Sequence, residues 1–220
     1  MRMDNGQAYR QAAKVLPLSL RGVALALPED KQGRAEELRL RIGHPVTVVF
    51  PQGELSLGTN PVTGRDLEHL LELASRASVH TVADQLRRGY LTVEGGHRVG
   101  LCGTPVLRDG QIHGLGRLSS AAIRVARQVT GAAAPVAQKL LEQSGAFCST
   151  LILAPPGAGK TTLLRDLIRM VSHGEGMAPQ RVAVADERGE VAALWNGVPQ
   201  LDVGERTDVL EGCPKAQALM

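Results

Sequence analysis

Apolar and polar residues follow two different periods along this chain, and the two periods predict where strands and helices lie. Charged and apolar side chains alternate over residues 36–42, which is typical of a half-buried strand. An apolar run at 46–50 predicts a second strand after the Gly-His-Pro turn at 43–45, and a Pro-Gln-Gly-Glu sequence at 51–54 predicts the next turn. Further short strands are expected at 91–107, 111–115 and 122–126, with a hairpin turn at Asp109-Gly110.

Helical spacing of apolar residues is present in the same part of the chain. The spacing over residues 13–27 is weak, is interrupted by Pro17 and ends at Pro28. A clearer helix is predicted to begin at Thr63, because Asp66 follows three positions later and apolar residues then recur at helical intervals. The N-terminal part therefore mixes helices with strands that pair in antiparallel fashion.

Two features complete the predicted domain organisation. A third helix is expected to begin at Thr81 and to end at Gly89. The small residues at 131–135 then mark a domain boundary. We expect an α+β domain over 1–131 and a nucleotide-binding domain over 132–220.

The second domain is organised around one sequence, LILAPPGAGKTT, at residues 151–162. Three apolar β-formers precede a Pro/Gly-rich loop, and a helical run at 163–171 follows, which is the order strand, phosphate loop, helix. Lys160 would neutralise the charge of the β- and γ-phosphates, and the Thr161 hydroxyl would hold Mg²⁺. Ala154 occupies the position of the motif's first glycine, and an ordinary Gly-rich turn is the alternative. The predicted nucleotide-binding residues are Pro155, Pro156, Gly157, Ala158, Gly159, Lys160, Thr161 and Thr162.

An acidic pair follows the next apolar run. Residues 182–185 predict a parallel strand, and a right-handed crossover from 151–153 would bring the carboxyl ends of both strands to one sheet edge. Asp186 would then hold Mg²⁺ or a metal-bound water, and Glu187 would activate or position the attacking water. The alternative is a solvated charged loop after a strand.

Composition adds little to this picture. Among 220 residues, 25 basic and 22 acidic side chains give a net charge of +3, with the basic residues scattered and aromatics at 2 %. This does not favour a nucleic-acid groove, which needs clustered cations and stacking aromatics. Three widely spaced cysteines predict reduced thiols in a cytoplasmic protein rather than a zinc site. The polar N-terminus lacks a signal-peptide core, and no apolar run is long enough to cross a membrane.

The sequence resembles the stage III sporulation protein AA family of endospore-forming bacteria, which belongs with the secretion-type, RecA-like P-loop ATPases. The phosphate loop alone indicates only an NTPase, whereas the GGHRVG and RTDVL stretches are specific to this family. The matching stretches are ELRLRIG at 37–43, GYLT at 89–92, GGHRVGL at 95–101, PPGAGKTT at 155–162, LLRD at 163–166, DER at 186–188 with Glu190, DVG at 202–204, RTDVL at 206–210 and CPKA at 213–216.

The resemblance implies a partial RecA-like α/β core after the smaller α+β domain. It also implies an Mg²⁺-dependent ATPase that forms a hexameric ring and serves a mother cell–forespore channel with membrane-embedded components. The protein would be cytoplasmic, and a peripheral position at the inner membrane of the mother cell is the alternative. Arg98, Arg124 and Arg206 are the candidates for arginines that reach the phosphates. Gly189 stands where the family usually has serine, and family members continue beyond the position of Met220 through further strands.

Several functions therefore stay open. The leading hypothesis is a secretion-type ATPase motor, and the alternative is a non-hydrolysing protein in which the nucleotide only orders an assembly. A small-molecule kinase would need an arginine-rich lid, which the sequence after residue 174 does not supply. A nucleic-acid translocase would need the basic groove whose absence is noted above.

Overall fold

The computed structural model describes residues 4–75 and 83–218. Contacts between residues divide the chain into two units, Met1–Arg127 and Gln128–Met220. The sequence places its boundary slightly later, after residue 131. Each unit is described by itself below.

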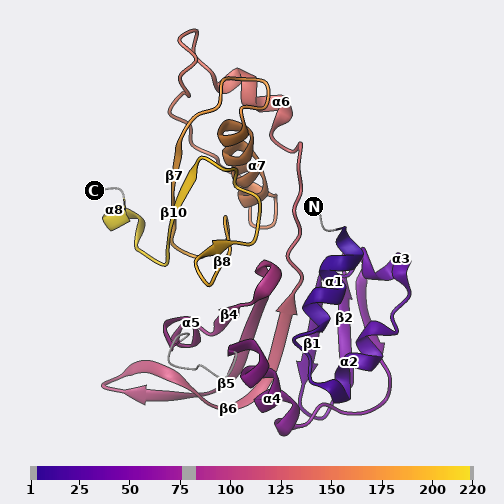
Figure 1. The fold of residues 1–220 in the computed structure, drawn as a ribbon. Coiled ribbons are helices and arrows are strands. Elements are labelled where there is room, and N and C mark those ends of the chain that lie inside the picture. The colour runs from indigo at the N-terminus through magenta and orange to yellow at the C-terminus, as the bar shows by residue number, and fades with distance from the viewer. Residues whose placement is uncertain (1–3, 76–82, 219–220) are drawn as a thin grey trace. The chain divides into compact units, whose positions relative to one another are not determined.

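The N-terminal unit is built on one antiparallel sheet of six strands, in the order β3-β2-β1-β6-β5-β4 (Figure 1). Its strands are β1 (Glu37–Arg41), β2 (Val46–Phe50), β3 (Gly53–Leu57), β4 (Tyr90–Thr92), β5 (Arg98–Arg108) and β6 (Gln111–Arg124). The strands expected at 36–42 and 46–50 are confirmed. Asp109 and Gly110 have φ of 51° and 76°, as a two-residue hairpin turn between β5 and β6 requires. β3 was not predicted, because its Gly-Glu start has the composition of a turn.

Two helices of this unit begin at side-chain caps, one formed by Asp4 and Gln7 and the other by Thr63 and Asp66. The helices of the unit are α1 (Asn5–Ala13), α2 (Leu18–Leu25), α3 (Glu29–Gln32), α4 (Gly64–Ser75) and α5 (Ala83–Arg87), with a 3-10 turn η1 (Glu94–Gly96). The interruption predicted at Pro17 and the end predicted at Pro28 are confirmed, because α2 runs from Leu18 to Leu25 and α3 begins only at Glu29. Both prolines occupy the N-cap positions of the helices that follow, α2 and α3, where a missing N–H costs nothing. The helix start at Thr63 is confirmed, since its amide donates to Asp66 Oδ2 at 2.8 Å. The predicted start at Thr81 lies outside the described residues.

One apolar core joins these helices to the sheet. Leu38 and Leu40 of β1 and Ile123 of β6 are fully buried on the same face of the sheet. Side chains from α1, α2 and α4 belong to the same cluster. The alternation of charged and apolar residues in β1 thus places every second side chain in the core.

The C-terminal unit contains the predicted phosphate-loop helix. Its elements are α6 (Ala134–Ala137), η2 (Gln138–Leu140), α7 (Lys160–His173), β7 (Val182–Asp186), β8 (Leu194–Trp195), β9 (Val198–Pro199), β10 (Thr207–Glu211) and α8 (Lys215–Ala218). β7 pairs in parallel with β10, and β8 pairs with β9 (Figure 1). The predicted α/β class, a P-loop helix with parallel strands after an α+β unit, is confirmed.

One element of the predicted nucleotide site is absent from this arrangement. Residues 151–153 do not form a strand, and Leu151 and Leu153 are 79 % and 81 % exposed. A strand is held by ladder hydrogen bonds, and β7 makes its ladder with β10 instead. The predicted crossover from 151–153 to a parallel neighbour is therefore wrong for this structure. The sequence analysis does not predict β10, because residues 206–210 enter it only as a stretch that matches the family.

Candidate phosphate-binding site

The glycine-rich loop ends at a helix N-terminus that carries no side-chain cap. Gly157 and Gly159 have φ of 77° and 83°, a backbone conformation that few other residues adopt. Gly159 is the N-cap of the 14-residue helix α7, and within the described part of the chain this helix start has no side-chain cap hydrogen bond. Unpaired amides and the positive end of the helix dipole together favour an anion. The loop therefore suits a phosphate group.

Lys160 lies folded over this loop. Its Nζ donates hydrogen bonds to the carbonyl oxygens of Ala154 and Pro155, both at 2.7 Å. These carbonyls are exposed, so phosphate oxygens can replace them as partners of the ammonium group at small cost. Ala154 is not among the residues with positive φ, which explains why alanine fits where the motif has glycine.

The remaining loop residues are consistent with the same use. Residues 154–159 are exposed, and Thr161 and Thr162 are half-buried in the first turn of α7. The Thr161 hydroxyl thus follows Lys160 directly at the helix start, where the motif needs a magnesium ligand. The residues present fit a nucleoside triphosphate.

Asp186 has a different environment from the one expected. Its side chain is buried, and its Oδ1 accepts a hydrogen bond from the amide of Glu190 at 3.0 Å. Its Oδ2 accepts from the amides of Val191 at 2.9 Å and Ala192 at 3.0 Å. Both carboxylate oxygens are thus bonded to the backbone of the loop that follows β7. Glu187, the next residue, is half-buried.

Arg165 of the P-loop helix holds the same loop through its carbonyl groups. Its Nε donates to Val191 O at 2.7 Å, and its Nη2 donates to Glu190 O at 2.5 Å. Burial lowers the pKa of Arg165, and the charges of Asp186 and Glu190 oppose this effect. Arg165 lies five residues, or about 7.5 Å, along α7 from Lys160. The sequence analysis missed this residue, which appeared there only within the LLRD match.

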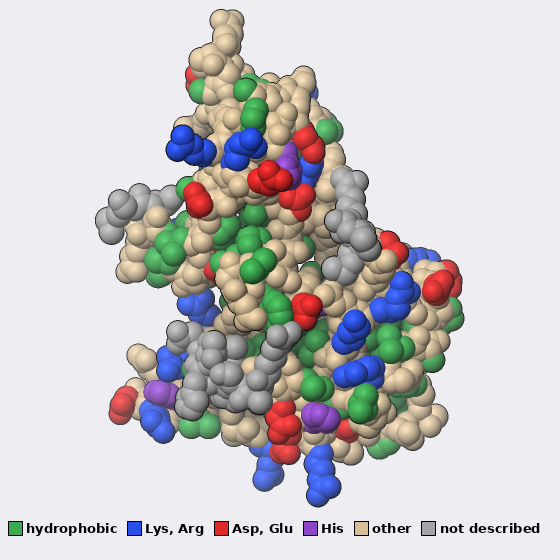
Figure 2. Space-filling model, viewed as in Figure 1, with side chains coloured by type: hydrophobic (Ala, Val, Ile, Leu, Met, Phe, Trp, Pro, Cys, Tyr) green, Lys and Arg blue, Asp and Glu red, His purple; other side chains and the backbone are tan. Residues whose placement is uncertain are grey.

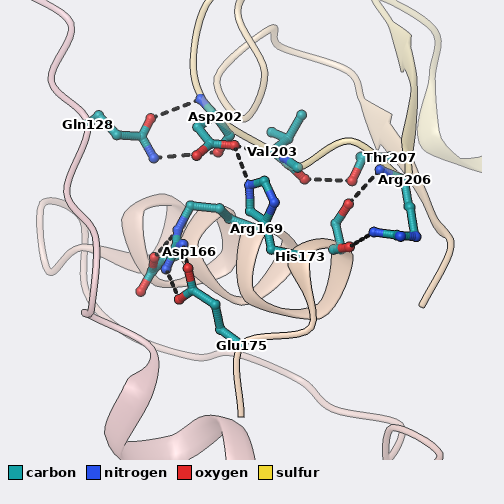
Figure 3. Close-up of polar contacts among 11 residues, drawn as sticks. Gln128, Asp166, Arg169, His173, Glu175, Asp202, Val203, Arg206 and Thr207 are labelled. Carbon is teal, nitrogen blue, oxygen red and sulfur yellow. Dashed lines mark hydrogen bonds and ion pairs between the residues drawn. The ribbon is translucent and has the colours of Figure 1, made fainter. Parts of the chain in front are cut away.

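The C-terminal half of α7 carries a second set of buried polar contacts (Figure 3). Arg169 Nε donates to Asp166 Oδ1 at 2.8 Å, and its Nη2 donates to Glu175 Oε2 at 2.8 Å. Asp166 Oδ2 also accepts from the amide of Ala133 at 2.8 Å. The helix that begins at the phosphate loop thus also fixes the start of α6.

The three candidate arginines lie in different surroundings. Arg98 stacks over the ring of Tyr90, 3.5 Å from its centroid, and is directly opposite Arg124 in the β5–β6 pair. Arg206 donates from Nη1 to the Ser172 carbonyl at 3.2 Å at the end of α7. A role for any of them at a phosphate stays a prediction.

Comparison with known proteins decides the family. The family model described as "Sporulation stage III, protein AA" matches residues 7–220. The chain belongs to this family. Stage III sporulation protein AA of Bacillus subtilis (strain 168) is 40 % identical over 211 residues, covering 96 % of this chain and 68 % of that protein. Protein SEEDLING PLASTID DEVELOPMENT 1 of Arabidopsis thaliana is 28 % identical over 168 residues, covering 76 % of this chain and 21 % of its own length.

The structure of this chain was also compared with solved structures. The ATPase DotB of Legionella pneumophila aligns with a TM-score of 0.46 at 12 % identity, over 96 % of this chain and 52 % of that chain. The VirB11 ATPase from the Brucella suis type IV secretion system, in complex with sulphate, aligns with a TM-score of 0.33 at 14 % identity, over 88 % and 62 %. The chain thus spans only part of these longer proteins. Among the described residues, no helix has the length and apolarity to cross a membrane.

Proposed function

We propose that this member of the stage III AA family binds Mg-ATP at the 154–162 loop and hydrolyses it as a secretion-type motor in endospore formation. The observation that carries the proposal is a glycine-rich loop that delivers Lys160 and Thr161 to the uncapped start of α7. Family membership over residues 7–220 supports the link to sporulation. The working site would be completed in a ring of subunits, a hexamer, beside membrane-embedded channel components in the mother cell.

The residues of the site have separate tasks in this proposal. When bound, ATP supplies the phosphoryl group and Mg²⁺ neutralises the phosphate charge. Amides at the start of α7 bind the phosphates, and Lys160 turns from the loop carbonyls to the β- and γ-oxygens. Thr161 offers its hydroxyl to the metal. Glu187 orients the attacking water or accepts its proton.

A second candidate is a non-hydrolysing assembly protein of the same channel, in which ATP only orders the ring. The observation that favours it is the carboxylate of Asp186, which is bonded to three backbone amides. An acidic group committed in this way does not contribute directly to hydrolysis. Binding of Mg-ATP without turnover would support this second candidate.

A nucleic-acid motor has less support. On the face of each unit drawn in Figure 2, Lys and Arg side chains lie close to Asp and Glu side chains. Single-strand binding needs a continuous positive track with stacking aromatics.

Titration of the protein with Mg-ATP tests the proposal, with hydrolysis and particle mass followed in the same samples. We expect Lys160→Ala to weaken binding by about tenfold to a hundredfold, because a charge-assisted contact worth about 1.5–3 kcal/mol is lost. Turnover and any nucleotide-dependent growth in mass should fall with it. Lys139→Ala, at an exposed lysine of the same unit, should leave all three readouts unchanged. Binding or hydrolysis that survives Lys160→Ala would overturn the assignment of this site.

A further inference from the structure

The loop after β7 is held between two buried charged side chains that bond to its backbone. Asp186 accepts from the amides of Glu190, Val191 and Ala192, and Arg165 donates to the carbonyls of Glu190 and Val191. Asp186 and Arg165 are 3 % and 8 % exposed. Asp186 thus binds the N–H groups of this loop, and Arg165 binds its C=O groups.

This arrangement disagrees with a magnesium role for Asp186. A carboxylate has about four lone-pair sites, and three of those of Asp186 already accept amide protons. Mg²⁺ requires nearly ideal octahedral geometry and keeps several of its waters, so it prefers carboxylates that face solvent or substrate. One site remains, but the Asp186 side chain is only 3 % exposed. To reach a hydrated metal it would have to move away from these amides, and the hydrogen bonds from Val191 and Ala192 are buried, so leaving those amides unpaired is costly.

Arg165 makes the same loop depend on the P-loop helix. Arg165 and Lys160 belong to the same helix, α7. The hydrogen bonds of Arg165 therefore fix the carbonyls of residues 190–191 relative to the helix that begins at the phosphate loop. Glu187 and Glu190 lie within this held segment, and Glu211 Oε2 accepts from the amide of Leu194 at 2.8 Å just beyond it. The loop is therefore supported along its length.

We propose that Asp186 and Arg165 are positioning residues that set the 187–192 loop against α7, and that Asp186 is not the magnesium ligand. The acidic side chains that this pair positions for the reaction are Glu187 and Glu190. The inference rests on the proposed ATPase function for its kinetic consequence. Its structural consequence, a loop held by both charges, does not depend on nucleotide.

The kinetic test compares Asp186→Asn with Arg165→Gln and with the double variant. Each single change should lower kcat by about tenfold to a hundredfold, as expected when a reacting group is displaced by about 1 Å. The Mg²⁺ concentration for half-maximal activity should stay within about twofold of the wild-type value in both. The double variant should lose little more than the worse single variant, because the two residues act on one loop. Arg165→Lys keeps the charge without the fork of donors and should recover part of the activity.

A metal ligand predicts a different pattern. If Asp186→Asn raises the half-maximal Mg²⁺ concentration tenfold or more while Arg165→Gln does not, Asp186 binds the metal and the proposal fails. Asp208→Asn removes an exposed carboxylate from the neighbouring strand β10 and is the matched control. It should change neither kcat nor the Mg²⁺ dependence.

Hydrogen exchange without nucleotide separates this inference from the proposed function. Asp186→Asn and Arg165→Gln should each speed exchange of the Glu190, Val191 and Ala192 amides by tenfold or more, with the amides of β5 and β6 unchanged. This holds even if the protein never hydrolyses ATP. Unchanged protection of the three amides in a variant that keeps its Trp195 fluorescence would overturn the inference.

Discussion

The two units of this protein bury different kinds of polar residue. Among the described residues, the buried polar side chains of the N-terminal unit are Gln32, Ser75, Thr92 and His97. Those of the C-terminal unit are Arg165, Asp166, Arg169, Ser172 and Asp186. Burial lowers the pKa of His97 to about 4, so the N-terminal set is uncharged at neutral pH. The C-terminal set is formed mainly of charged groups.

The apolar cores differ in the opposite sense. One cluster joins helices and sheet throughout the N-terminal unit, whereas the described part of the C-terminal unit has two small clusters around α7 and β7. Apolar burial tolerates small changes of geometry, but a buried charge is stable only with its partners in place. We infer that paired charges position the loops around α7, while apolar packing holds the N-terminal sheet.

The largest effect is expected at Asp166. Asp166→Ala should lower the free energy of unfolding of the C-terminal unit by about 4 kcal/mol, because it leaves the buried Arg169 guanidinium and the Ala133 amide without this partner. Urea unfolding followed by the fluorescence of Trp195, the one tryptophan of the sequence, measures this unit.

Leu38→Ala is the matching change in the N-terminal unit. It removes a fully buried side chain of β1 and should cost about 3 kcal/mol. The two tyrosines, Tyr9 and Tyr90, both lie in this unit and report its unfolding. A cost below about 1 kcal/mol for Asp166→Ala would show that buried charges do not control the C-terminal unit.

Elements with a local sequence signal could be predicted, whereas elements that depend on a distant partner could not. Strands β1 and β2, the Thr63–Asp66 helix start and helix α7 were predicted because their signals are local: alternation, caps and glycines. The 151–153 strand failed because a strand exists only where another strand pairs with it. β10, which pairs with β7, gave no comparable local signal.

The buried charges of α7 were unpredictable for a further reason. Arg165, Arg169 and Ser172 recur at i, i+4 and i+7, a polar stripe that usually faces solvent. Here the stripe faces the 187–192 loop, Asp166 and the turn before β10.

The GGHRVG stretch at 95–100 likewise predicted a family but no structural role. The structure shows that a Cβ on Gly95 would lie 2.2 Å from Gln11 Oε1 and 2.8 Å from His97 Nε2, so this glycine makes room for a buried histidine.

That histidine provides a smaller, pH-dependent test. Nδ1 of His97 accepts the Ala126 amide at 3.0 Å, which requires the neutral ring. Because the folded pKa is lowered from 6.5 to about 4, the unfolded chain takes up the proton first as the pH falls. The contribution of neutral His97 to the free energy of unfolding is therefore complete above pH 6.5 and is lost as the pH falls from 6.5 to 4. This contribution is on the order of 2–3 kcal/mol.

Unfolding measured by tyrosine signals across this pH range tests the point. His97→Gln should be less stable at neutral pH. Its free energy of unfolding should also fall less steeply with pH between 6.5 and 4 than that of the wild-type protein. The Trp195 transition should not show a slope that depends on His97. An unchanged slope in His97→Gln would mean that other groups cause the acid sensitivity of the N-terminal unit.

The smallest effect is expected at the exposed end of the network around Arg169. Glu175 accepts a hydrogen bond from Arg169, which lowers the pKa of the Glu175 carboxyl group. The pair therefore stabilises the folded state above pH 4.5, and this contribution is lost as the pH falls below that value. The Glu175 side chain is 49 % exposed, however, and solvent screens the pair. Glu175→Gln should therefore cost only about 0.5 kcal/mol at pH 7, measured by Trp195 unfolding. Arg169 thus contacts one buried and one exposed carboxylate, and equal costs for Glu175→Gln and Asp166→Ala would show that burial does not set the value of these pairs.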